Sequence, residues 1–85
     1  DLDSYLTGAF RIAARAFDLL DRVDPSPDHW RGKRGAIIGA FRNVVGHIDG
    51  VDCIDELLQM LADDDHAESD QIRRIIWQWS QDNVT

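Results

Sequence analysis

The stretch LDSYLTGAFRIAARAFDLLDRV, from Leu2 to Val23, decides the fold that this sequence predicts. When each residue is rotated by about 100° around a helix axis, the apolar residues of this stretch cover roughly half of the cylinder. A surface helix with a single neighbour needs an apolar stripe only about 100° wide. We therefore expect a long N-terminal helix that contacts at least two neighbours and forms the centre of a small helical bundle.

Two prolines separate this helix from the next one. The first helix ends before Pro25, because proline donates no helical hydrogen bond and the residue before a proline avoids helical angles. Ser26 has the side chain of an N-cap, and Pro27 suits the first position of a new helix. A second helix is therefore predicted to begin here.

Glycines interrupt the start of this second helix. Gly32 and Gly35 each weaken a helix by about 1 kcal/mol, so we expect a short turn at 27–31, a break or kink, and a main helix over about 34–47. Small residues at i, i+4 spacing predict a close approach to the first helix. They are Gly35, Ala36, Gly39 and Ala40.

Two more helical patterns follow, over about 50–62 and about 70–82. No stretch of the chain alternates with period two over the length of a strand. The predicted core face of the last helix consists of Ile72, Ile75, Ile76 and Trp79. We predict a single all-α domain over residues 1–85, a compact four-helix bundle of orthogonal or up-down type around the long N-terminal helix, with a fifth short turn at 27–31.

The distribution of charge divides the chain. The net charge is −7, yet residues 31–47 contain four basic residues and no acid, whereas residues 48–85 contain ten acids against two arginines. A general nucleic-acid binder needs a basic face to neutralise phosphates, so nucleic acid is an unlikely partner. The acidic half either meets a basic partner surface or serves solubility alone.

Composition excludes several other classes of protein. A single cysteine, Cys53, can form no intramolecular disulfide and cannot supply a zinc site, which needs about four Cys or His ligands. No run of about 18 apolar residues predicts a membrane span, and the N-terminus lacks the pattern of a signal peptide. We expect a cytoplasmic protein without cofactor or metal, and no catalytic motif predicts an enzyme.

Trp77 is the first candidate contact residue. It lies away from the predicted core face of the last helix, on the side that also carries Arg73, Arg74 and Gln81. Tryptophan and arginine concentrate at the centres of protein interfaces, so this face is predicted to bind a partner. The alternative is that Trp77 packs inside the domain.

The second candidate is the basic stretch that begins at Arg31, Lys33 and Arg34. Glycines flank these residues, and a loop of this kind before a helix can hold a phosphate with its free amide groups. The P-loop pattern is missing. The other interpretations are a basic docking patch for an acidic protein surface and a solvated loop without a role.

The sequence therefore predicts a protein–protein interaction module, an adaptor or assembly domain. It would recognise its partner through an exposed Trp/Arg face and complementary charged patches, and the partner is another protein or a second copy of the chain. One alternative is a small acidic inhibitor or immunity-type protein that covers a basic site. An alternative of another class is a phosphate or nucleic-acid contact through the basic stretch 31–42.

Overall fold

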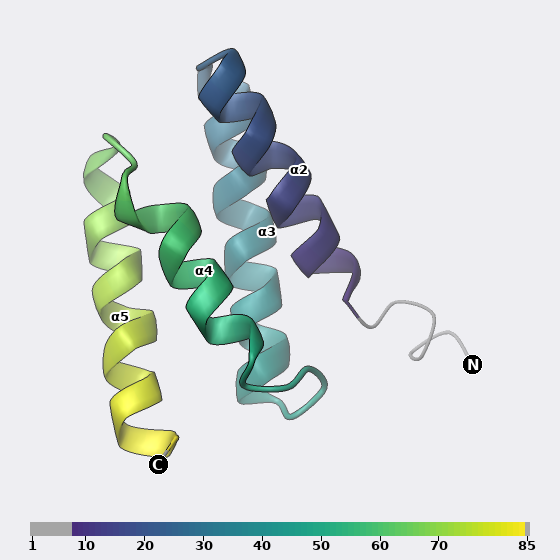
Figure 1. Cartoon of the computed structure of the whole chain (residues 1–85), viewed down its shortest axis with the longest axis vertical. Helices are drawn as coiled ribbons and strands as arrows, with labels where there is room; N and C mark the ends of the chain where they lie inside the picture. Colours follow the sequence, from purple (N-terminus) through teal and green to yellow (C-terminus); the bar gives the residue numbers. More distant parts are fainter. Residues whose placement is uncertain (1–7, 85) are drawn as a thin grey trace.

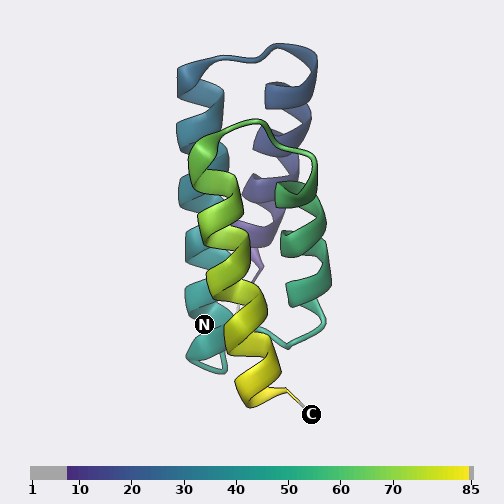
Figure 2. The same cartoon turned by 90° about the vertical axis from the view of Figure 1, so that its left-hand side faces the viewer.

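The computed structural model describes residues 8–84, and these fold into four helices without a strand. The helices are α2 (Ala9–Val23), α3 (Pro27–Val45), α4 (Cys53–Ala62) and α5 (Ala67–Asn83). Consecutive helices run antiparallel and form two hairpins, α2/α3 and α4/α5, which lie side by side (Figures 1 and 2). The prediction of a compact all-α fold is thus confirmed. The start of the predicted helix over 2–23 lies outside the described residues.

The central helix is α3 and not the N-terminal helix, so that part of the prediction is wrong. Six residues of α3 are buried, whereas α2 buries only two residues, Ala14 and Asp21. Helix α3 packs against α2 on one side and against α4 and α5 on the other (Figure 1). The main apolar core joins the inner face of α3 to α4, with Ile76 of α5 completing it.

The predicted break at 31–35 is also wrong, because α3 is continuous through both glycines. A Cβ atom on Gly32 would overlap the ring of Phe17, and one on Gly39 would overlap the ring of Phe10. These two glycines let the phenyl rings of α2 lie directly on the backbone of α3. The predicted close approach of the two helices is therefore confirmed at Gly39, and tertiary packing outweighs the low helix propensity of glycine. Gly35 has open space around it.

The ends of the helices follow the local signals with small shifts. Ser26 caps α3, where its Oγ accepts a hydrogen bond from the backbone N–H of His29 at 3.0 Å, and Pro27 is the first helical residue. Helix α4 begins three residues later than predicted, and α5 three residues earlier. Ile75, predicted as a core residue, is 56% exposed, while its neighbour Ile76 is buried.

Candidate partner-binding surfaces

Most of the predicted basic patch is occupied by internal ion pairs. Arg31 Nη2 lies 2.7 Å from a carboxylate oxygen of Asp28, and Arg34 Nη1 lies 2.9 Å from one of Glu68. Because the whole stretch is helical, its backbone amides are used within the helix and form no loop around a phosphate. The proposed phosphate cradle therefore has no structural basis.

Lys33 is a correction to the predicted contact residues, since its side chain lies inside the domain. It is 1% exposed, and its Nζ lies 2.8 Å from Asp64 Oδ2 and 2.9 Å from Asp18 Oδ1. The ammonium group thus ties α3 to α2 and to the connection between α4 and α5. Burial alone would raise the pKa of Asp64, but hydrogen bonds from Lys33 and from the backbone N–H of His66 hold this pKa below its usual value. Lys33 is accordingly unavailable to a partner.

The face around Trp77 remains on the surface. Trp77 is 49% exposed, and Gln81 one turn later is exposed as well. Arg73 and Arg74 both bind the carboxylate of Asp70, at 2.6 and 2.8 Å, and the hydrogen bond from Arg73 lowers the pKa of that carboxyl. The structure therefore presents a half-exposed indole beside two arginines whose charge Asp70 partly balances.

An exposed apolar surface that was not predicted lies on one side of α2. Four large side chains on this side are between 42% and 71% exposed. Together with the small, exposed Ala16 they form the surface that we call the α2 apolar stripe: Ile12, Ala16, Leu19, Leu20 and Val23.

The remaining sides of α2 are already in use. Its phenyl rings contact α3, and two of its arginines, Arg11 and Arg15, pair with acids at the start of α4. Arg15 donates to both carboxylate oxygens of Glu56, at 2.6 and 2.9 Å, and Arg11 lies 3.2 Å from Asp52. The hydrogen bond from Arg15 lowers the pKa of Glu56. The wide apolar surface of this helix is the sequence signal for the stripe, but the same pattern also predicts additional neighbours within the bundle.

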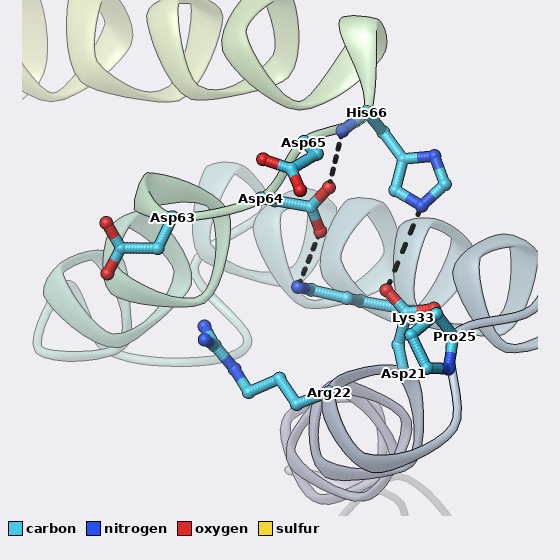
Figure 3. Close-up of a pocket in the computed structure, with 8 residues that line it drawn as sticks. All are labelled: Asp21, Arg22, Pro25, Lys33, Asp63, Asp64, Asp65 and His66. Atoms are coloured by element: carbon cyan, nitrogen blue, oxygen red, sulfur yellow. Dashed lines mark hydrogen bonds and ion pairs between the residues drawn. The ribbon is translucent and has the colours of Figure 1, made fainter.

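A pocket of about 420 Å³ lies where the end of α2, helix α3 and the α4–α5 connection meet. Figure 3 shows the carboxylate of Asp21 and the ring of His66 on its walls, with Asp21 Oδ2 3.9 Å from His66 Nε2. On its other side the His66 ring stacks on Trp30, with the ring centres 4.2 Å apart and 9° between the planes.

In the described part of the chain, no group of three or more His, Cys, Asp or Glu side chains is arranged to hold a metal ion. None of the helices at 9–83 is long and apolar enough to cross a membrane.

Fold and surfaces together define an all-α domain of two stacked helical hairpins with exposed apolar side chains on its outer helices. The family described as Intraflagellar transport protein 56 matches residues 2–85, and the chain belongs to this family. A protein named Intraflagellar transport protein 56 homolog, from Caenorhabditis elegans, is 27% identical over 82 residues, which are 93% of this chain and 14% of that protein. The chain therefore spans only a small part of the length of this relative. No solved structure matches the chain.

Proposed function

We propose that this chain is a non-catalytic interaction domain of an intraflagellar transport protein, and that the α2 apolar stripe binds an apolar helix of another protein. Family membership supports the transport context, because the family description and the relative's name both refer to intraflagellar transport. The observation that carries the proposal is the exposure of the stripe on a helix whose other sides are already packed.

The spacing of the stripe favours a helical partner. Ile12, Ala16, Leu19 and Val23 follow one another at intervals of four, three and four residues, which is the spacing that helices present to one another in helix pairs. A large apolar side chain contributes about 1.5–3 kcal/mol when it moves from full exposure to burial. At roughly half exposure each side chain would contribute about 1 kcal/mol, which is about a factor of five in affinity.

The Trp77 face supplies a second contact in this proposal. A half-exposed indole beside Arg73 and Arg74 has the composition of an interface centre, and Gln81 extends the same side of α5. Arg31 and Arg34 would lie at the rim, where charges steer association more than they add affinity. The expected cytoplasmic location stays a prediction.

Other predicted functions have less support. A second copy of the chain is an alternative occupant of the stripe and is distinguished by the test below. The acidic inhibitor rests on the net charge alone, and the phosphate or nucleic-acid contact has lost its predicted loop because residues 31–42 are helical and mostly paired. We therefore adopt neither.

Leu19→Asp tests the proposal, with Ile75→Asp as the matched control. Both residues are exposed, at 63% and 56%, so both variants should fold, but Ile75 lies on α5 outside the stripe. Proteins captured by the wild-type chain from ciliated cells are identified, purified and titrated against the three forms. We expect Leu19→Asp to weaken binding about tenfold or more and Ile75→Asp to leave it unchanged. Equal binding by Leu19→Asp would refute the proposal, as would light scattering that shows a dimer of the chain disrupted by Leu19→Asp.

A further inference from the structure

We infer that the pocket between α2, α3 and the α4–α5 connection binds an arginine side chain of a protein partner. The inference goes beyond the proposed function, because it concerns a different surface and states the chemistry of the group bound. It shares with that proposal only the premise that the partner is a protein.

The charges around the pocket are unbalanced. Its two basic side chains are already engaged, Lys33 with Asp64 and Asp18, and Arg22 with Asp18 at 2.9 Å. Three carboxylates on the lining are left over, and none of them has a lysine or arginine at salt-bridge distance among residues 8–84. They are Asp21, Asp63 and Asp65. A cation from outside the domain is the complement to this arrangement.

Asp21 is the strongest indication that the pocket has a ligand. The residue is only 9% exposed, and its Oδ1 is buried without a hydrogen-bond partner. Among residues 8–84, the basic group at salt-bridge distance from its carboxylate is His66 Nε2, which lies 3.9 Å from Oδ2 and is charged only when protonated. Because Oδ1 is sealed from solvent, an entering guanidinium would reach this carboxylate through Oδ2, which has no lysine or arginine partner among residues 8–84. A carboxylate that is nine-tenths buried gains from such a charged donor.

The shape of the wall favours arginine over lysine. The His66 ring lies flat on Trp30, its side chain is 40% exposed, and it lines the pocket, so an imidazole ring held by stacking lies next to the carboxylates. A planar guanidinium stacks on such a ring and donates two parallel hydrogen bonds to a carboxylate, whereas an ammonium group does neither. A volume of about 420 Å³ is sufficient for a guanidinium and part of its aliphatic stem.

The test is a titration of the isotope-labelled chain with N-acetyl-arginine amide, followed by NMR at the indole N–H of Trp30 and the backbone N–H of His66. Two control compounds are titrated in the same way. N-acetyl-citrulline amide has nearly the same shape as the arginine probe but no charge, and N-acetyl-lysine amide has the charge but no planar guanidinium group. We expect the arginine probe to shift both signals and to bind at least about tenfold more tightly than citrulline and about threefold more tightly than lysine.

Variants locate the binding. Asp21→Asn should weaken arginine binding about tenfold, while Asp55→Asn, which removes the same charge from an exposed site outside the pocket, should change it less than about twofold. Asp21→Asn removes a buried unpaired charge, so its melting temperature should be equal to or higher than that of the wild type. Asp65→Asn, at an exposed position, is a second variant that should weaken binding several-fold without affecting the fold.

Three results would overturn the inference: equal binding of arginine and citrulline, lysine binding as tight as arginine, or an unchanged affinity in both Asp21→Asn and Asp65→Asn. The outcome is separable from that of the proposed function. Leu19→Asp should leave the arginine titration unchanged, so a failure of the α2 apolar stripe to bind a partner leaves the pocket result standing, and the converse also holds.

Discussion

Replacing Lys33 with methionine is expected to destabilise the chain by about 3–5 kcal/mol, because the change leaves buried carboxylates without their cation. Methionine keeps most of the volume and the unbranched shape of the lysine stem, so packing is nearly preserved. Asp64 is the residue most affected, since its side chain is only 3% exposed and its Oδ2 accepts a hydrogen bond from Lys33 Nζ at 2.8 Å.

The magnitude is large relative to the stability of the whole domain. At about 0.05–0.15 kcal/mol per residue, a chain of this length is expected to have a free energy of unfolding of only about 4–13 kcal/mol. Lys33→Met should therefore lower the urea midpoint strongly or unfold the chain. A double-mutant cycle with Asp64→Asn isolates the pair: the second substitution should recover at least about 1 kcal/mol in the Lys33→Met background, because it removes the unpaired charge.

The assay is urea unfolding followed by circular dichroism at neutral and at acidic pH. The pKa of Asp64 is lowered in the folded chain, so its contribution to stability is present above an unfolded pKa of about 3.9 and is lost as the pH falls through the lower, folded pKa. This loss below about pH 4 should be smaller in Asp64→Asn. A cost of less than about 1 kcal/mol for Lys33→Met, with no coupling to Asp64, would refute the buried ion pair that we describe.

Four further substitutions test helix packing, helix capping and the burial of Trp77, each by the shift of the urea midpoint. Gly32→Ala should cost about 1–3 kcal/mol because its Cβ meets the ring of Phe17, whereas Gly35→Ala, with open space around it, should stabilise α3 by about 0.5–1 kcal/mol; equal effects would contradict the close approach of the helices. Ser26→Ala should cost about 1 kcal/mol through loss of the cap, and an unchanged midpoint would show that the cap contributes nothing. Trp77→Ala should cost about 1 kcal/mol, and a loss of 3 kcal/mol or more would mean that the indole is a core residue.

Short-range signals account for the parts of the fold that were predictable. The four helices of residues 8–84 followed from apolar periodicity. The boundary between α2 and α3 followed from Pro25, Ser26 and Pro27, whose effects depend on the backbone of their immediate neighbours. The contact between the helices at Gly39 followed from the spacing of small residues on one side of a helix.

The candidate surfaces were less predictable, because each depends on residues that are distant in the sequence. The charge of Lys33 predicts a surface position, but its partner Asp64 lies 31 residues later, and only folding brings them together. Trp77 was placed off the core face by helical geometry alone, and the structure leaves it half exposed. The pocket beside Asp21 has no sequence pattern at all, since three separate segments line it.

The sequence by itself determined that the chain is helical, where its second helix begins and that its N-terminal helix carries more apolar surface than one neighbour can cover. Only the tertiary structure decided which helix is central, which charges are buried and which apolar side chains stay exposed. The physical reason is the sequence separation over which each effect acts. Helix formation and capping depend on residues up to four positions apart, whereas burial depends on whether a distant segment, such as Phe17 on Gly32 or Asp64 on Lys33, arrives to cover a side chain.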